Sequence, residues 1–470
     1  MSAADHHADL AERLHRLLEK GAQEASRRHE PVLVSTVVRA PSRDPVRLFQ
    51  GAGAQERALW EQPSQGFSLV VIGAAARLIG HGGNPFAEVA VAWRRLRSNT
   101  LADATHEFPF ALPICLGGFS FDPLRPRDPC WEAYPDALLI VPRFLFVSSG
   151  GSSWFCLSLM TTPDSDAHAT ADAAMAELSR LLSTAGEESE RPIGDLMLDE
   201  EVAPEAWKAV VAQIADDIRR GTLEKTVLAR RVRIRSTTSL TSGPVLDRLR
   251  RGYGNCTILA FALGDRCFLG ATPERLVRLD GRNVRTDCLA GSTARGASEE
   301  EDRSLAEALL ADAKERHEHA LVVRAVCQAL APLCSDLAVP ETPGLLRMPN
   351  VQHLHTPVLG VLRDEAHILE IVERLHPTPA SGGLPRQAAL SLIRRYEPFD
   401  RGWYAGPVGW IDGHGGGEFA VAIRSALLSG NEALLYAGCG IVAGSDPDLE
   451  YRESCLKLRP MLWALNGKQP

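Results

Sequence analysis

The sequence predicts an α+β protein built on large antiparallel sheets. Short β-prone runs are separated by turn segments that contain glycine, so neighbouring strands can pair as hairpins. Helical spacing occurs at irregular intervals between these runs, whereas parallel sheets need regular strand–helix alternation. The 470 residues, 45% hydrophobic and 23% charged, have an ordinary globular composition and are enough for one to three domains.

The N-terminal part predicts an amphipathic helix followed by short strands. Residues 1–20 carry charged and histidine side chains without an apolar centre, which is unlike a signal peptide. Strand-like runs follow at 67–73 and 137–140. The most apolar stretch, 137–147, is interrupted by Pro142 and falls short of the roughly 20 residues of a membrane helix, so we expect no membrane span.

Charge and cysteine usage exclude several classes of function. The formal net charge is −8, so the chain as a whole does not attract nucleic acid. The ten cysteines form no CxxC pair, which argues against a structural zinc site and fits a reduced, cytoplasmic protein. The sequence contains neither a Walker A motif nor a GxSxG nucleophile elbow.

The pattern becomes clearer after residue 204. Residues 205–219 have helical spacing, and residues 225–234 alternate as a strand. Two further strands, 257–263 and 267–271, are expected to form a hairpin that turns at residues 264–265.

A capping box then opens a long helix. Ser298 with Glu301 three residues later is a helix N-terminal signature, and the helix is expected to run to about Leu330. A last helix covers about 447–465. The late strand runs are joined by short loops and are expected to form an antiparallel meander: 406–411, 419–428 and 433–438.

Two of these helices each carry a pair of carboxylates. Glu315 and Glu318 are three residues apart on the long helix and share a face, as Glu450 and Glu453 do on the last helix. Together they could hold Mg²⁺, which prefers about six oxygen ligands, or they could be solvated charges on the helix surfaces.

Three further side chains could take part in chemistry. Arg424 lies among alanines on the 419–428 strand, where it could bind a carboxylate or form a cross-strand salt bridge. Lys225 and Glu274 each lie at the end of a short loop. Removed from water, such a lysine can act as a base and such a glutamate as an acid, although both are more often surface charges. The glycine-containing segment 437–444 lacks GxGxxG spacing, so nucleotide binding is rejected there, but its backbone could approach another ligand.

These segments, taken in order, resemble the core of the chorismate-utilising enzymes. The resemblance extends from residue 225 to about residue 465. The motifs that carry it are KTVLAR (225–230), LGATPERL (269–276), LAGST (289–293), KERHEH (314–319), VQHLHTP (351–357), LHPTPA (375–380), EPFDR (397–401), WYAGPVGW (403–410), AIR (422–424), AGCGIV (437–442) and EYRE (450–453) with Lys457.

The resemblance implies a fold and a division of the chain. The family fold is a single large domain with two stacked antiparallel sheets flanked by helices. Residues 1–200 match this fold loosely, and residues 201–470 form the chorismate-binding catalytic part. The acidic stretch 183–205 is then a connection within one structural domain and not a domain boundary.

The resemblance also implies a role for each site residue. Lys225 is the base that activates water, and Glu274 is the acid that protonates the departing ring hydroxyl. The implied Mg²⁺ ligands are Glu318 and Glu453, with Glu315 and Glu450 bound to the metal waters. The implied substrate-binding residues are Gly291, Ser292, His353, Ala380, Tyr404, Arg424, Gly438, Gly440 and Lys457.

The family divides according to the nucleophile. Members that add water carry a lysine at the position of Lys225, whereas ammonia-adding members usually lack it and need a glutamine amidotransferase, so we expect no such partner. The string ending at Ala380 is similar to isochorismate synthases, but Ser381 is closer to salicylate synthases, which also eliminate pyruvate. The prediction is an isochorismate synthase that serves menaquinone or siderophore synthesis. A salicylate synthase and a non-catalytic chorismate-binding homologue remain the alternatives.

Overall fold

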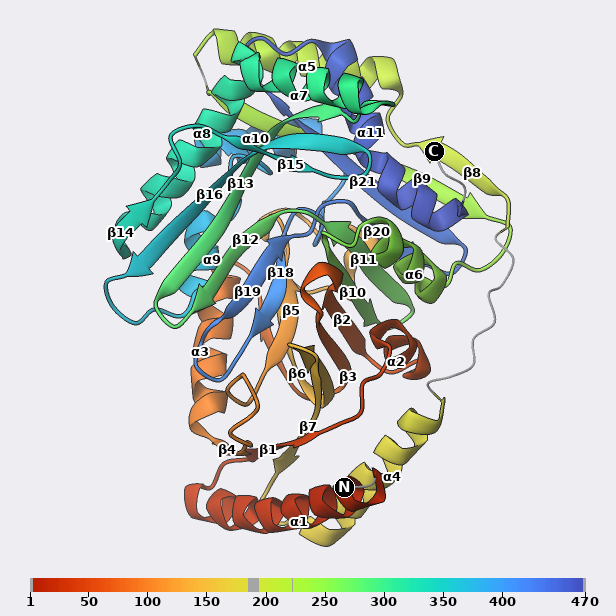
Figure 1. Cartoon of the computed structure of the whole chain (residues 1–470), viewed down its shortest axis with the longest axis vertical. Helices are drawn as coiled ribbons and strands as arrows, with labels where there is room; N and C mark the ends of the chain where they lie inside the picture. The colour runs from red at the N-terminus through yellow and green to blue at the C-terminus, as the bar shows by residue number, and fades with distance from the viewer. Residues whose placement is uncertain (1–2, 185–193, 222, 468–470) are drawn as a thin grey trace.

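The computed structural model describes residues 3–184, 194–221 and 223–467, and it confirms the α+β class (Figure 1). Part of the predicted connection 183–205 lies outside the described residues. No helix in the described ranges is long and apolar enough to cross a bilayer. The helices are α1 (Ala3–Arg28), α2 (Pro45–Gly51), α3 (Pro85–Ser98), α4 (Ala167–Thr184), α5 (Pro204–Arg219), α6 (Ser242–Gly252), α7 (Glu299–Ala311), α8 (Ala313–Leu330), α9 (Ile368–Leu375), α10 (Arg386–Tyr396) and α11 (Pro447–Asn466).

The strands fold into two stacked antiparallel layers that are joined through β6, which pairs with β3, β5 and β7. One layer runs from β3 through β2, β10, β11, β20 and β21 to β9. The other runs from β5 through β18, β19, β12 and β13 to β16. The strands are β1 (Val32–Arg39), β2 (Arg57–Gln62), β3 (Phe67–Gly80), β4 (Thr100–Asp103), β5 (Cys115–Phe119), β6 (Ala137–Ser149), β7 (Ser152–Thr161), β8 (Leu196–Glu200), β9 (Lys225–Ser236), β10 (Thr257–Leu263), β11 (Arg266–Thr272), β12 (Arg275–Asp280), β13 (Asn283–Ala294), β14 (Cys334–Ala338), β15 (Gly344–Arg347), β16 (Val351–Leu362), β17 (Gly383–Leu384), β18 (Pro407–Ile411), β19 (Gly417–Val421), β20 (Ser425–Ser429) and β21 (Glu432–Ile441).

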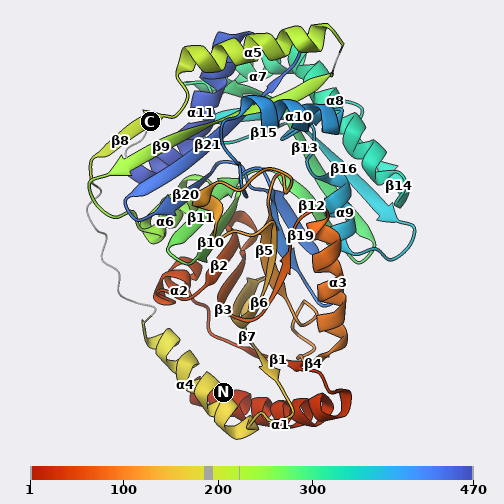
Figure 2. The ribbon, with the colours of Figure 1, turned by 180° about the vertical axis from the view of Figure 1, so that it is seen from behind.

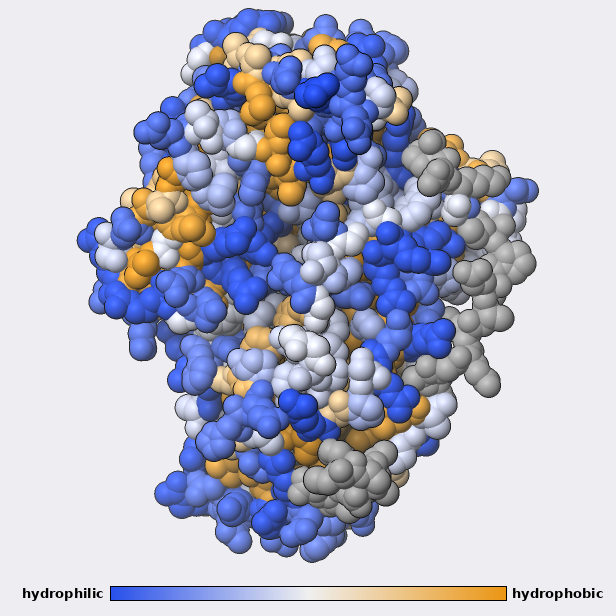
Figure 3. Space-filling model, in the orientation of Figure 1, coloured by the Kyte–Doolittle hydropathy of each residue, from blue (hydrophilic) through white to orange (hydrophobic). Residues whose placement is uncertain are grey.

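Helices cover the outside of these layers. Figures 1 and 2 show α5, α7 and α11 gathered at one end of the molecule and α1 with α4 at the opposite end. The space-filling view shows a mostly polar surface with scattered apolar side chains (Figure 3), as is normal for a globular protein.

Aromatic side chains fill the space between the two layers. Phe261 and Phe268 from one layer and Phe419 from the other belong to the same buried cluster. Trp403, just before β18, contacts Phe261 of β10 with ring centroids 5.3 Å apart. Each such buried ring contributes about 1.5–3 kcal/mol to folding, so this core fixes how the layers, and the loops at their edges, lie relative to each other.

The N-terminal and C-terminal parts of the chain share these sheets. On β2 and β10, Trp60 lies opposite Leu259. On β5 and β18, Gly117 lies opposite Gly409. Each layer therefore contains strands from both parts of the chain.

The long helix predicted from Ser298 is in fact two helices. Asp312 has an extended backbone (φ −65°, ψ 118°), and its carboxylate accepts the amide hydrogen of Glu315 at 2.9 Å, so a new helix begins at Ala313. Apolar spacing continues across the break, which is why periodicity alone predicted one helix. Asp312 followed by Glu315 is itself a helix-start signal, and it places the first carboxylate pair near the beginning of α8.

The strand predicted at 419–428 is also two strands. β19 ends at Val421 and β20 begins at Ser425, and between them Arg424 has a φ of +53°. This left-handed conformation costs a non-glycine residue about 1–3 kcal/mol. Because β19 and β20 belong to different layers, the predicted meander is two separate hairpins. Arg424 therefore does not lie on a strand face, as expected, but at the crossing between the layers.

Candidate active site

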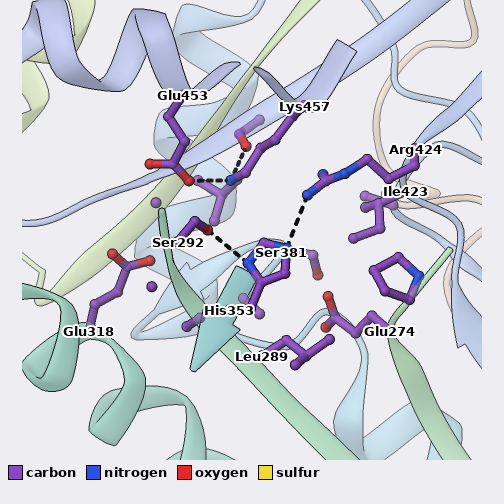
Figure 4. A pocket seen from close by; sticks show the side chains of 18 of the residues that line it. Glu274, Leu289, Ser292, Glu318, His353, Ser381, Ile423, Arg424, Glu453 and Lys457 are labelled. Carbon is purple, nitrogen blue, oxygen red and sulfur yellow. Dashed lines mark hydrogen bonds and ion pairs between the residues drawn. The ribbon is translucent and has the colours of Figure 1, made fainter. Parts of the chain in front are cut away.

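A cavity lies between the ends of β9, β13, β16 and β21 and the helices α8 and α11. All of the site residues predicted from the sequence line it except Glu315 and Glu450, and Figure 4 shows how several of them face one another. The structure thus brings together segments that are far apart in the chain. The lining residues are Lys225, Val227, Pro273, Glu274, Leu289, Ala290, Gly291, Ser292, Glu318, His353, Ala380, Ser381, Arg401, Tyr404, Ala405, Ile423, Arg424, Gly438, Gly440, Glu453 and Lys457.

Lys225, the first residue of β9, is buried rather than a surface charge. Its exposed fraction is 1%, and its Nζ lies 2.8 Å from Oε1 of Glu318 on α8. Burial of an ammonium group is tolerated only with a charged or hydrogen-bonded partner. The ion pair therefore holds the amine in the cavity wall, next to the carboxylates of α8 and α11.

Glu274 follows β11 and is also buried, with 6% of its surface exposed. Its backbone is fixed, because its amide donates to Thr272 Oγ1 at 3.2 Å and its carbonyl accepts from the Val421 amide at 3.0 Å. Burial raises the pKa of Glu274 to about 7, against the opposing effect of the Lys225 ammonium. A carboxyl group with this pKa can donate a proton near neutral pH.

Four carboxylates from α8 and α11 lie in two rows beside the cavity. Glu318 and Glu453 line the cavity itself. Behind them, Lys314 joins the other two: its Nζ lies 3.2 Å from Oε1 of Glu315 and 2.8 Å from Oε1 of Glu450. Lys314 was not predicted as a site residue, although it begins the KERHEH motif.

This carboxylate cluster is suited to a hard divalent cation. Glu450 is only 1% exposed, yet its Oε2 has no hydrogen-bond partner, which is costly for a buried oxygen. Ligand atoms of Glu450, Glu453 and Cys439 lie within 4.8 Å of one another. Burial raises the pKa of the Cys439 thiol well above its usual range, so the oxygen ligands dominate.

Two cations, Lys457 and Arg424, also line the cavity. Lys457 Nζ lies 2.6 Å from Oε1 of Glu453 and donates to the carbonyl of Gly438 at 2.9 Å. Arg424 is 6% exposed, and its buried Nε has no hydrogen-bond partner. A guanidinium with an unsatisfied N–H next to a cavity suits an anionic ligand, particularly a carboxylate.

Glycine residues on β21 allow the side chains of neighbouring elements to approach the cavity wall closely. A Cβ atom at Gly440 would lie 2.2 Å from Oε1 of Glu318, and one at Gly438 would lie 3.3 Å from the hydroxyl oxygen of Tyr404. Tyr404 is buried and stacks on Tyr436 with ring centroids 4.9 Å apart. Glycine at position 440 therefore leaves room for the carboxylate of Glu318, and Ala380 is a further small residue in the lining.

Arg401 is the main polar lining residue that sequence reasoning missed. It is 2% exposed and pairs with Glu397, and it donates to the carbonyls of Ser381 (2.9 Å) and Val227 (2.8 Å). It thus ties β9 to the loop that carries Ala380. The four-residue spacing of Glu397 and Arg401 was visible in the sequence, but spacing does not indicate burial.

Comparisons with known proteins agree over almost the whole chain. A protein-family model described as "Chorismate binding enzyme" matches residues 20–466. "Salicylate biosynthesis isochorismate synthase" of Pseudomonas aeruginosa is 40% identical over 467 residues, which is 98% of this chain and 96% of that protein. "Isochorismate synthase MenF" of Bacillus subtilis is 34% identical over 447 residues, which is 93% of this chain and 94% of that protein.

Solved structures show the same architecture. The menaquinone-specific isochorismate synthase MenF from Escherichia coli has a TM-score of 0.77 and 28% identity, covering 96% of this chain and 99% of that one. A structure described as a putative 2,3-dihydroxybenzoate-specific isochorismate synthase, DhbC from Bacillus anthracis, has a TM-score of 0.72 and 28% identity, covering 90% of this chain and 99% of that one.

Proposed function

Since the chain belongs to the chorismate-binding enzyme family, we propose that it is an isochorismate synthase, which converts chorismate reversibly to isochorismate. The observation that carries this proposal is that Lys225 and Glu274, a potential base and a potential acid, line one cavity. Both are buried and both are held by the fold.

The reaction follows from these two groups. Lys225 acts in its unprotonated form, in which the amine can still donate a hydrogen bond to Glu318, and takes a proton from a water molecule whose oxygen bonds to the ring. The ring double bonds shift, the bond from the ring to the 4-hydroxyl breaks, and Glu274 protonates that hydroxyl so that it leaves as water. One water enters and one leaves, so chorismate and isochorismate are isomers. Each general acid–base contribution is worth about 10²–10⁴ in rate.

We further propose that the divalent cation of this site is Mg²⁺. Glu318 and Glu453 would hold it directly, and Glu315 and Glu450 would bind its waters. The ion would neutralise the carboxylate cluster and attract a carboxylate of the substrate. Arg424 and Lys457 supply the remaining positive charge for a dianion, and Ser292 supplies a hydroxyl.

The pH dependence of kcat/KM should follow the titration of Glu274. The acid works only while protonated, so kcat/KM should fall as the pH rises through its pKa of about 7, with a limiting slope of about tenfold per pH unit above it. Glu274→Gln should lower kcat by about 10²–10⁴-fold and abolish this alkaline limb. Initial rates between pH 5.5 and pH 9, about the range in which such a group titrates, measure both effects.

Glu61 offers a matched control for that experiment. It is also buried, and burial raises its pKa to about 7, but it does not line the cavity. Glu61→Gln should therefore keep the alkaline limb. If Glu274→Gln keeps the limb too, the acid is another group.

Product analysis tests the proposed function directly. With chorismate and Mg²⁺ alone, the enzyme should yield an equilibrium mixture of chorismate and isochorismate, because moving one hydroxyl around the ring changes the bond energies little. The same mixture should form when isochorismate is supplied. Chromatography decides the outcome.

Two other products would contradict this assignment. Stoichiometric salicylate and pyruvate would place the enzyme with the salicylate synthases, the alternative that Ser381 in the cavity wall supports. Anthranilate formed only when ammonia is added would remove the role given to Lys225. We propose that the enzyme works in the cytoplasm without a glutamine amidotransferase, with residues 1–200 and 201–470 as parts of one domain.

A further inference from the structure

Ser292, His353 and Arg424 form a chain of hydrogen bonds along one wall of the cavity (Figure 4). Ser292 Oγ lies 2.8 Å from Nδ1 of the His353 ring. On the other edge of the ring, Nε2 lies 3.4 Å from Nη2 of Arg424. His353 is 6% exposed, so water cannot readily replace either partner.

The donor and acceptor roles in this chain are fixed by Arg424. A guanidinium has only N–H donors, so Nε2 of His353 must accept. Burial lowers the pKa of His353 to about 3, with Arg424 acting in the same direction, so the ring is neutral at physiological pH and carries one hydrogen. That hydrogen is therefore on Nδ1, which donates to Ser292 Oγ and also interacts with the Gly291 backbone.

Because Ser292 Oγ accepts from His353, its own hydrogen must point elsewhere. Among the described residues, no side chain or backbone group accepts this hydrogen, and Ser292 lines the cavity. Figure 4 places Ser292 on the side of His353 that faces Glu318 and Glu453. The free hydrogen is thus available to an acceptor in the cavity.

The backbone fixes Ser292 in this position. Gly291, with φ +80°, forms a bulge in β13, and after the bulge Ser292 lies directly opposite His353 on β16. The amide of Ser292 donates to Oε2 of Glu315 at 3.1 Å. The backbone of Ser292 is therefore fixed beside the His353 ring.

We infer that His353 is a positioning residue that makes Ser292 a hydrogen-bond donor to a carboxylate of the substrate. His353 acts through Ser292 and does not exchange a proton with the substrate. This inference rests on the proposed chorismate-binding function and assigns one contact within it.

Two substitutions test the hydrogen bonds of Nδ1 and of Nε2 of His353 separately. The side-chain amide of asparagine reaches about as far as Nδ1 and that of glutamine about as far as Nε2. His353→Asn can still donate to Ser292, whereas His353→Gln can only satisfy Arg424. A lost hydrogen bond to a charged group weakens binding by about tenfold to a hundredfold.

In His353→Gln and in Ser292→Ala, the KM for chorismate should rise by about tenfold to a hundredfold. In His353→Asn, the rise in KM should be smaller. When His353→Gln and Ser292→Ala are combined, the KM should rise no further than in either single variant. Larger damage from His353→Asn than from His353→Gln would assign the role to Arg424 and overturn the inference. Additive losses in the double variant would overturn it as well.

The hydrogen position can be measured without turnover. In the ¹⁵N spectrum of the free protein labelled at histidine, the signal that disappears in His353→Asn should show a protonated Nδ1 and a bare Nε2. The opposite tautomer would overturn the inference even if the enzyme converts chorismate as proposed. If the wild-type enzyme fails to convert chorismate, the proposed function fails while the tautomer is still tested.

Discussion

Replacing Lys225 with alanine should reduce conversion of chorismate by about 10²–10⁴-fold, because the proposed base that takes the proton of the attacking water is lost. Within the described lining, the other lysine is Lys457, which is engaged by Glu453 and by the carbonyl of Gly438. The effect should fall on kcat more than on KM, since a base acts in the transition state. Steady-state kinetics of the purified variant measure this.

The same substitution has a cost for stability. Lys225 is buried and paired with Glu318, and removing one partner of a buried ion pair costs about 3–5 kcal/mol. Thermal melting must therefore accompany the kinetics, and Lys225→Gln, which retains hydrogen bonding, serves as the milder variant. Lys20→Ala, at an exposed lysine of α1, is the control and should change neither quantity. A folded Lys225→Gln with wild-type turnover would show that the water is activated by another group.

Removal of the divalent cation should cause the second large loss. Four carboxylates repel one another and repel a dianionic substrate, so chelation with EDTA should lower turnover by at least about a hundredfold, and added Mg²⁺ should restore it. Glu318→Gln and Glu453→Gln should each produce a similar loss that Mg²⁺ does not reverse. Calorimetric titration with Mg²⁺ should show weakened binding in both variants.

Glu300→Gln is the control for these variants, because Glu300 is an exposed carboxylate on the first turn of α7 and away from the cluster. It should bind Mg²⁺ and turn over like the wild type. Full activity of the wild-type enzyme in metal-free buffer would end the metal proposal.

The sequence predicted most of the polar residues that line the cavity but not how they pair. Each motif places one or two side chains at the end of a strand or on a helix face, so motif order named these residues, although it missed Arg401. It could not reveal that Lys225 contacts Glu318 or that Lys314 joins Glu315 to Glu450. Such contacts depend on how α8 and α11 pack against β9 and β21, and the sequence pattern does not specify that packing.

The two wrong element predictions have a common cause. At both Asp312 and Arg424, the periodic pattern continues through a break in the backbone. Periodicity reports which side chains are buried and does not report backbone direction. Asp312 could have been recognised from its capping pattern, whereas a left-handed arginine has no sequence signature. Arg424 adopts this conformation where the chain crosses from one layer to the other, between β19 and β20, and the guanidinium lies in the cavity wall.

The pairing of β2 with β10 and of β5 with β18 also determines how the protein must be made. Neither layer is complete until both early and late parts of the chain have left the ribosome. Contacts between such distant segments form slowly, and strand edges that await their partners promote aggregation. The nascent chain must therefore be kept soluble until β21, the last strand of the layers, emerges. For the same reason, the C-terminal half produced alone would not be a smaller version of the enzyme, because β10 and β18 would each lose a neighbouring strand.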